Sequence, residues 1–406
     1  MHPILFEIPL PALKVQAWPL LGIVAVCGVA LGAYGWRQRA RDLWRTGAGV
    51  AVVAALLAWL LRSRTYTIEP LPVYSYGALL CLSLVVGWVL TSGLGQQRGM
   101  DRARLANVFL ISLFAALAGA RLLYVFTNWR EFPSFAEALA LRRGGFVAYG
   151  GFLGGFLGAW LYLRRSPWRF ARWADVAAPS VALGIVLTRI GCYLFGCDFG
   201  KPLATGAPEW LQALGVFPRW PASSLGAGSP AWLHHVDHRG LPPHAPASLP
   251  VHPTQLYEAL AGVGVFLLLL HVRKRQRFDG QMLLTCTIAY GWARFCIETL
   301  RDDPERGLFG PSLPAHWYVG SALLAFAIAY ATGPARSIAA SALRQGTRIL
   351  ALVPAVLAFV VLAPRGAGTG AVLQLSTSQW VAFATTALAT WAWTRHLPSA
   401  TPRGAG

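Results

Sequence analysis

The stretch ANVFLISLFAALAGARLLYVFT, residues 106–127, decides the fold class, because it is predominantly apolar and long enough to cross a bilayer as one helix. Ten further apolar runs share this composition: 18–34, 47–61, 74–94, 147–163, 174–195, 253–270, 279–299, 316–333, 349–363 and 371–394. Most of them approach the length of about 17–25 residues that a membrane span needs. The sequence therefore predicts an all-α fold, a polytopic transmembrane helical bundle of about 11 spans.

The composition agrees with this fold class and excludes several others. Of the 406 residues, 55% are hydrophobic and only 13% are charged, which argues against a disordered chain and against a water-soluble globule. The net charge is +19, but there is no zinc finger, basic helix or RNA-binding motif, so we expect no nucleic acid as a partner. Since no nucleotide, flavin or zinc signature is present, we also expect no cofactor and no metal.

The distribution of basic residues predicts the orientation. Alternate loops, starting after the first run, hold 20 of the 35 Lys and Arg residues, and the opposite set of loops holds 12. The positive-inside rule places the richer set in the cytoplasm. The N-terminus is then outside and the C-terminus is cytoplasmic, as an odd number of spans requires.

Three arginines lie inside apolar runs: Arg121, Arg189 and Arg294. An Arg within the membrane costs at least about 3 kcal/mol, so each should have a partner or a function. All three come late in spans that run outward, which places them in the outer half of the membrane. An Arg at that depth can simply extend to the interface. Three at one depth, each in a distinctive motif, favour a shared site for an anion.

Two of these motifs place a tyrosine near the outer end of a span. In GARLLYVF, residues 119–126, Arg121 and Tyr124 are three positions apart and share a helix face. In GGFVAYGGFLGG, residues 144–155, Tyr149 lies between glycine pairs. These glycines permit either close helix contact or a broken helix start.

The motif RIGCYLFGCDFGKP, residues 189–202, ends a span in a glycine-rich turn. Backbone N–H groups in such a turn can bind an anion. Cys192 and Cys197 leave a metal site and a disulfide open as alternatives, although two cysteines without a second pair are a weak zinc signature. The histidine-rich stretch 234–244 matches no standard metal spacing, and we interpret it as solvated loop.

Two further motifs supply carboxylates at the outer ends of spans. HPTQLYEAL, residues 252–260, groups polar side chains at the start of a span: His252, Gln255, Tyr257 and Glu258. In YGWARFCIETLRDDP, residues 290–304, Arg294 and Glu298 are four apart and can pair on one helix face. A buried structural ion pair is the alternative interpretation of this second motif.

The order of GARLLYV, GG…YGG…GG, RIGC…G…FGKP, HPTQLYE and YGWARFCIE resembles the prolipoprotein diacylglyceryl transferase family of bacteria, over roughly residues 72–332. The resemblance implies a seven-span core, residues 72–333, which includes an outer loop at 196–252. An N-terminal extension, 1–71, and a C-terminal extension, 334–406, would each add two spans. It also implies transfer of the diacylglyceryl group of phosphatidylglycerol to the lipobox Cys of preprolipoproteins at the outer face of the inner membrane.

The resemblance also implies roles for individual residues. Tyr76, Arg189, Gly200, Arg294 and Glu298 stand where the family has important residues. With Tyr149, the expected catalytic set is Tyr76, Tyr149, Arg189, Arg294 and Glu298, and the expected substrate-binding set is Arg121, Tyr124, Gly200, Gln255, Tyr257 and Glu258. By the same resemblance the chain departs from the family before Tyr76, where Tyr74 and Ser75 replace Arg-Trp. It also departs where Tyr149 replaces a His, Cys192 replaces an Asn, and Cys197 replaces an acid with Asp198 one place later.

Two other functions compete with the transferase. A catalytically altered relative would bind phospholipid or lipoprotein precursors, or act on a different acceptor, and complementation of a bacterium depleted of its transferase distinguishes it. A transporter commonly shows internal repeats. The sequence has none, and no charged path continues toward the inner side.

Overall fold

The computed structural model describes residues 3–8, 13–37, 41–60, 65–68, 71–132, 134, 137, 145–220, 228–303, 307–364 and 372–396. The chain divides into two compact units, one formed by His2–Ser75 and the other by the chain from Tyr76 onward. Each unit is described by itself below. The expected division into a core and two extensions remains a prediction.

The first unit is a pair of helices, α1 (Ala17–Arg37) and α2 (Arg41–Leu60), preceded and followed by short strands. Strand β1 (Ile4–Ile8) pairs antiparallel with β4 (Leu71–Tyr74), and β2 (Leu13–Gln16) pairs antiparallel with β3 (Thr65–Ile68). The helices approach closely because glycines face each other, and a Cβ on Gly47 would lie 2.3 Å from the Gly32 nitrogen.

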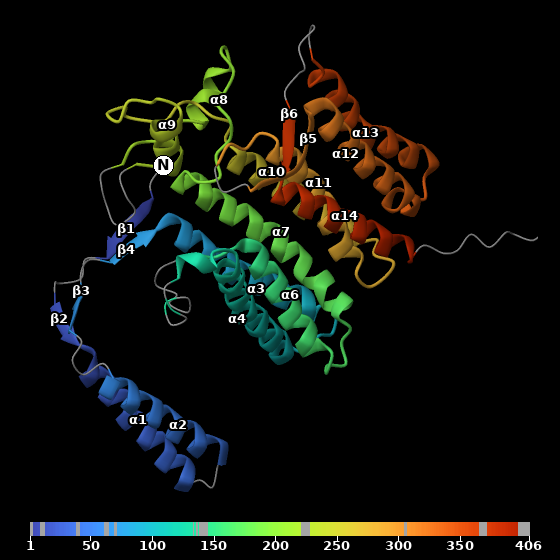
Figure 1. Ribbon diagram of the computed structural model, residues 1–406. Coiled ribbons are helices and arrows are strands. Elements are labelled where there is room, and N and C mark those ends of the chain that lie inside the picture. Colours follow the sequence, from blue (N-terminus) through green and yellow to red (C-terminus); the bar gives the residue numbers. More distant parts are fainter. Residues whose placement is uncertain are drawn as a thin grey trace, which may run out of the picture. The chain divides into compact units, whose positions relative to one another are not determined.

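The second unit is built from long helices (Figure 1). In chain order these are α3 (Ser75–Gln96), α4 (Arg102–Thr127), α6 (Ala148–Leu163), α7 (Phe170–Phe195), α10 (Thr254–Arg273), α11 (Gln281–Glu298), α12 (Ala315–Thr332), α13 (Ser341–Val361) and α14 (Thr377–Thr394). Short 3-10 helices cover Trp129–Glu131 and Pro334–Ser337. Strand β5 (Leu308–Pro314) pairs antiparallel with β6 (Val372–Ser376). The two-stranded ribbons in both units were not predicted.

The membrane character of the helices follows from their length and composition. Six helices in the described part of the chain are long and apolar enough to cross a membrane, and they are α3, α4, α7, α10, the segment Ala315–Arg336 and α13. Every apolar run in the sequence overlaps a helix in the described part of the chain, and the run 371–394 also includes strand β6. The predicted all-α polytopic fold is confirmed, and the number of spans remains a prediction.

Glycine contacts join α4 to α6. A Cβ on Gly150 would lie 2.3 Å from the Gly119 oxygen, and one on Gly154 would lie 2.2 Å from the Ala115 oxygen. No side chain fits at these positions, so the two backbones touch. Of the two alternatives for the glycine pairs, close helix contact is therefore what occurs, since α6 begins at Ala148 and is unbroken.

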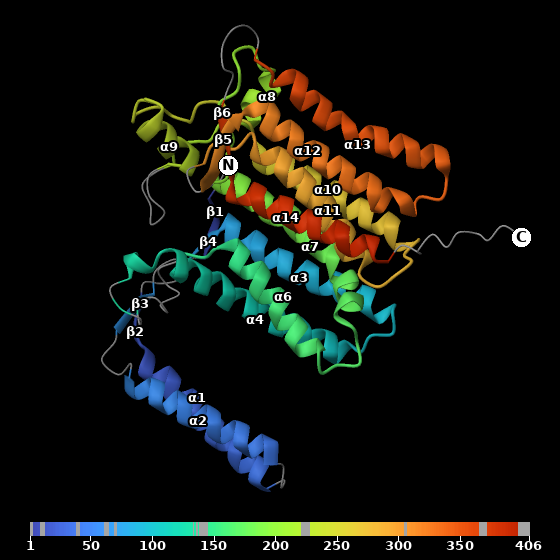
Figure 2. The same cartoon turned by 45° about the vertical axis from the view of Figure 1, so that its right-hand side comes forward.

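Helices α7, α10, α11 and α14 lie side by side (Figure 2). On one end of this group, the buried Asp175 of α7 accepts hydrogen bonds from the N–H groups of Gly280, Met282 and Leu283, at 2.7, 2.8 and 3.2 Å. These N–H groups at the start of α11 have no partner within the helix. The carboxylate thus fixes α11 against α7, and these two helices carry Arg294 and Arg189.

The segment between α7 and α10 folds at the opposite end of the group. It contains α8 (Glu209–Leu214) and α9 (Pro230–His238), and its core consists of Phe199, Phe217, Ala231 and Val251. The interpretation of 234–244 as solvated loop is wrong for His235, which is fully buried and whose Nδ1 lies 3.2 Å from the Leu249 nitrogen. Burial lowers the pKa of His235 to about 4, so its ring is neutral.

Candidate active site

The site begins where α7 ends. Gly196 has a φ of 82°, and its N–H closes the helix on the Cys192 carbonyl at 2.8 Å. Asp198 follows with a φ of 57°, a left-handed conformation that Asp tolerates better than most residues. This turn brings the Asp198 carboxylate back to Arg189 of α7, and the two side chains form an ion pair.

The start of α10 holds this turn in place. The Thr254 hydroxyl donates to the Asp198 carbonyl at 2.6 Å, and the Gln255 amide donates to the Cys197 carbonyl at 2.5 Å. Gly200 lies against two other segments, since a Cβ there would lie 2.6 Å from the His252 oxygen and 2.8 Å from the Leu300 oxygen. Only glycine fits there, so the three loops that follow α7, precede α10 and follow α11 can meet.

Glu258 of α10 is the centre of the site. One of its carboxylate oxygens accepts from Arg189 Nε and from Arg294 Nη1, both at 3.0 Å. The other oxygen accepts from the Tyr290 hydroxyl. The residue is only 2% exposed. One carboxylate therefore joins the arginines of α7 and α11, which satisfies the need of a buried charge for partners.

The network continues beyond Glu258. Arg294 Nη2 lies 2.8 Å from Glu298, and Arg301, just after α11, pairs with both Asp198 and Asp303. Arg301 Nη1 also lies 3.8 Å from Glu298. The ion pairs close into a ring through Arg189, Glu258, Arg294, Glu298, Arg301 and Asp198. Such a ring holds each guanidinium in a fixed orientation.

Charges in the loops of the site reinforce one another. Burial alone would raise the pKa of the Asp198 carboxyl, but the guanidinium groups of Arg189 and Arg301 outweigh it and lower that pKa below its usual range. Burial would likewise lower the pKa of Arg301, and Asp198 and Asp303 outweigh it and raise that pKa. Both partners therefore remain charged at neutral pH.

Tyr149 approaches the network from α6. Its hydroxyl donates to the Ser378 hydroxyl of α14 at 2.7 Å, and Arg294 Nη2 donates to the same Ser378 oxygen at 3.2 Å. Tyr149 is thus joined to Arg294 through one serine. Helices far apart in the sequence, α6, α11 and α14, contribute to this part of the site.

Comparison with known proteins shows which family the chain resembles. A family profile described as prolipoprotein diacylglyceryl transferase matches residues 63–333, about two thirds of the chain and the whole ion-pair ring. The chain belongs to this family.

Relatives named phosphatidylglycerol–prolipoprotein diacylglyceryl transferase agree with the match. One from Clostridium tetani is 28% identical over 58% of this chain and 83% of its own length. A second from Clostridium perfringens, whose name carries the number 2, is 30% identical over 59% of this chain and 83% of its own length. A third from Thermosynechococcus vestitus is 32% identical over 56% and 77%.

Most residues that the family resemblance indicated lie at or beside the ring. Arg189, Arg294, Glu258 and Glu298 are members of it. Tyr76, in the first turn of α3, packs on the "RIG" motif, where a Cβ on Gly191 would lie 3.3 Å from the Tyr76 Cα.

Three members of the expected binding set have contacts outside the ring. Arg121 donates to the Gly145 carbonyl at 3.0 Å and lies 5.6 Å from the Tyr124 ring. The Tyr124 contact lies within α4, and the Gly145 contact joins α4 to the residues just before α6. The Tyr257 hydroxyl lies 3.3 Å from His252 Nδ1.

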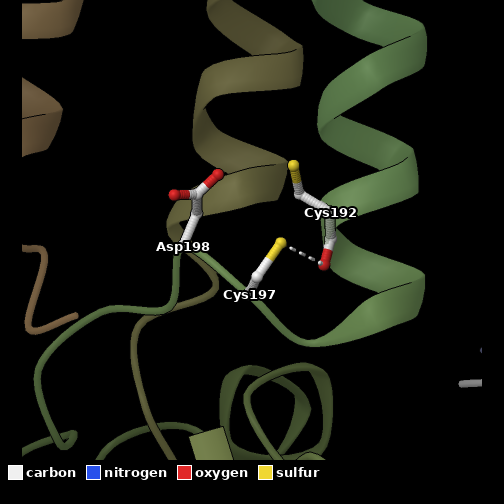
Figure 3. A group of neighbouring side chains, drawn as sticks. All are labelled: Cys192, Cys197 and Asp198. Atoms are coloured by element: carbon white, nitrogen blue, oxygen red, sulfur yellow. Dashed lines mark hydrogen bonds between the residues drawn. The ribbon is translucent and has the colours of Figure 1, made fainter. Parts of the chain in front are cut away.

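Cys192, Cys197 and Asp198 form a cluster at the end of α7, with ligand atoms within 4.8 Å of one another (Figure 3). Asp198 already binds Arg189 and Arg301, and Arg189 Nη1 lies 3.8 Å from the Cys192 sulfur. A cation would thus lie beside a guanidinium, which opposes its binding. A hydrogen bond with Cys192 and burial raise the pKa of the Cys197 thiol, so it is a poor metal ligand.

The sequence reasoning missed several members of the site. Asp198 was noted only as an acid displaced by one position, although it binds two arginines. The sequence around Arg301 could have indicated an ion pair, because Arg301 follows Glu298 by three positions and precedes two acids. Tyr290 had only its place four residues before Arg294 as a signal. Ser378 had none.

Proposed function

We propose that this chain transfers the diacylglyceryl group of phosphatidylglycerol to the lipobox Cys thiol of preprolipoproteins. The observation that carries the proposal is the buried Glu258 carboxylate shared by Arg189 and Arg294, within a family whose relatives bear that activity in their names. The arrangement presents fixed guanidinium groups near the ends of apolar helices, where a lipid headgroup would lie.

Arg189 is the proposed contact for the phosphate. Its Nε and Nη1 bind Glu258 and Asp198, and its Nη2 takes no part in these bonds. Its side chain is 20% exposed, compared with 10% for Arg294 and 7% for Arg301. A guanidinium that is held by two carboxylates and still offers N–H groups suits a phosphodiester, because its planar fork matches phosphate oxygens.

The proposed reaction exchanges one bond for another. The thiol sulfur attacks the carbon of the diacylated glycerol that is bonded to the phosphate oxygen. A C–S bond forms there, and the C–O bond between this carbon and the phosphate breaks. Glycerol phosphate leaves, and the proton of the thiol finally resides on that phosphate or in water. The arginines stabilise the charge that develops on the leaving phosphate.

Tyr149 is proposed to act on the thiol or the ester through its hydroxyl. Because its proton is directed to Ser378, the lone pairs of the phenolic oxygen remain available to the substrate. We propose Arg294, Glu298 and Tyr76 as the other members of the catalytic set. Gly200, Gln255, Tyr257, Glu258, Arg121 and Tyr124 are proposed to bind or shape the substrate site.

The proposed location is the bacterial inner membrane, with the site at its outer face. Reporter fusions after positions 168 and 275 should therefore give a cytoplasmic signal, and a fusion after position 225 should give an external one. The physical reason is the excess of Lys and Arg in the first set of loops. A cytoplasmic signal from position 225 would place the site in the wrong leaflet for a secreted precursor.

Complementation tests the function in cells. Expression of this chain should restore growth and lipoprotein maturation in a bacterium depleted of its own transferase. The altered-relative alternative, in which phospholipid or precursor is bound without transfer, is favoured if the chain reaches the membrane at normal levels and maturation still fails.

A further inference from the structure

Helix α14 lies outside the part of the chain that the family explains. The family match ends at residue 333, and α14 covers Thr377–Thr394. It nevertheless packs directly on α11, the helix of Arg294. At the contact, a Cβ on Gly291 would lie 2.3 Å from the Thr386 hydroxyl and 3.7 Å from the Thr386 Cβ. The side chain that faces Gly291 across this contact is that of Thr386.

The first turn of α14 is fixed from several directions. Ser376 and Gln379 form a capping box, with hydrogen bonds of 3.3 and 3.0 Å. The Gln379 amide also donates to the Phe295 carbonyl of α11 at 3.4 Å, and Thr377 N–H donates to the Gly307 carbonyl at 2.9 Å. Strand β6, which leads into the helix, pairs with β5. Ser378, in this turn, is therefore held in a defined place.

We infer that Ser378 is a positioning residue of the active site, an inference that rests on the proposed function. Its oxygen accepts from the Tyr149 hydroxyl at 2.7 Å and from Arg294 Nη2 at 3.2 Å. A serine oxygen has two lone pairs, so these two donors occupy both. Ser378 thereby fixes the direction of the Tyr149 hydroxyl and the plane of the Arg294 guanidinium.

The consequence is that an element added to the family core sets the geometry of two core residues. Without the Ser378 oxygen, the Tyr149 hydroxyl can rotate and its lone pairs no longer face one direction. Arg294 Nη2 keeps only its pairing with Glu298 at 2.8 Å. Both changes disturb groups that act in the transition state, so the rate should fall more than the affinity for lipid.

Ser378→Ala, Ser378→Thr and Thr385→Ala test this inference in the purified full chain. We expect Ser378→Ala to lower kcat by about 10–30-fold, with KM for phosphatidylglycerol changed by less than about threefold. Ser378→Thr keeps the hydroxyl and should recover most of the rate. Thr385 lies on the same helix and its hydroxyl bonds only to α14 carbonyls, so Thr385→Ala should be unchanged.

A double-mutant cycle separates positioning from general weakening of the fold. If Ser378 acts through Tyr149, Ser378→Ala should cost less than about threefold in a Tyr149→Phe background. The inference is wrong if Ser378→Ala keeps at least half of the wild-type kcat, or if Ser378→Thr loses as much as Ser378→Ala. It is also wrong if the fold-losses of Ser378→Ala and Tyr149→Phe simply multiply in the double variant.

Crosslinking tests the placement of α14 without any activity. Gly291→Cys with Thr386→Cys should form a disulfide, because the two Cβ atoms are about 3.7 Å apart, near the usual separation. Gly291→Cys with Thr385→Cys is the control and should not. A protease site inserted after Arg365 reports the link as fragments that stay joined on a non-reducing gel. Absence of the link contradicts the inference even if the wild type is active, whereas absence of transfer by the wild type contradicts the proposed function and this inference together.

Discussion

Arg189→Lys should lower the transfer rate by about 10²–10³-fold. Arg189 binds Glu258 through Nε and Asp198 through Nη1, and its third nitrogen, Nη2, is the atom that we propose to bind the phosphate. A lysine ammonium is a single point of charge on a flexible stem, and it cannot reproduce this fork. The positive charge is kept, so the Glu258 and Asp198 carboxylates are not left without a cation. The measurement is kcat/KM for transfer from phosphatidylglycerol to a lipobox peptide.

Arg239→Lys is the matched control. Arg239 also pairs with an aspartate, Asp302, but its side chain is 41% exposed and it has no bond to the ring. Exposed ion pairs contribute little, so transfer should stay within about twofold of wild type. If Arg189→Lys keeps more than a tenth of the activity, Arg189 does not bind the phosphate through its fork.

Tyr149→Phe should lower transfer by about 10²-fold or more. Phe keeps the aromatic ring and removes only the hydroxyl that bonds to Ser378, so the loss reports on that hydroxyl. The family resemblance implies a His at this position, and Tyr149→His should retain activity if a base or an orienting group is all that is required. Tyr162→Phe, on the same helix, is the control. The Tyr162 hydroxyl lies 3.4 Å from Asn107 Nδ2 and has no bond to the ion-pair ring.

Full activity of Tyr149→Phe would remove the hydroxyl from the mechanism. The chemistry would then rest on Arg189, Arg294 and Glu298, with the thiol proton lost directly to water or to the leaving phosphate. It would also remove the reason for which Ser378 is proposed to position Tyr149. The two variants thus test linked parts of one account.

Much of the fold could be predicted because the apolar runs that form membrane helices are continuous in the sequence. Each apolar run became a helix, since a span must satisfy its backbone hydrogen bonds internally. The Arg294 and Glu298 pair was also local, four residues apart on one helix. The short ribbons β1–β4, β2–β3 and β5–β6 were not predicted, because they join segments separated by whole helices.

The candidate site could be predicted only in part, because its decisive contacts are between helices. The motifs identified Glu258, Arg189 and Arg294 individually, but that one carboxylate binds both arginines is a property of how α7, α10 and α11 pack. Ser378 is 229 positions from Tyr149, and nothing in the residues around it has a pattern that relates it to the site.

The most direct test of the account is transfer by the purified protein. The full chain, in bilayers that contain phosphatidylglycerol, is incubated with a lipobox peptide and the peptide mass is measured. The account predicts a thioether adduct heavier by one diacylglyceryl group, with one glycerol phosphate released for each adduct, and no product from a peptide whose lipobox Cys is replaced by Ser. A folded protein that binds phosphatidylglycerol but yields neither adduct nor glycerol phosphate would contradict it.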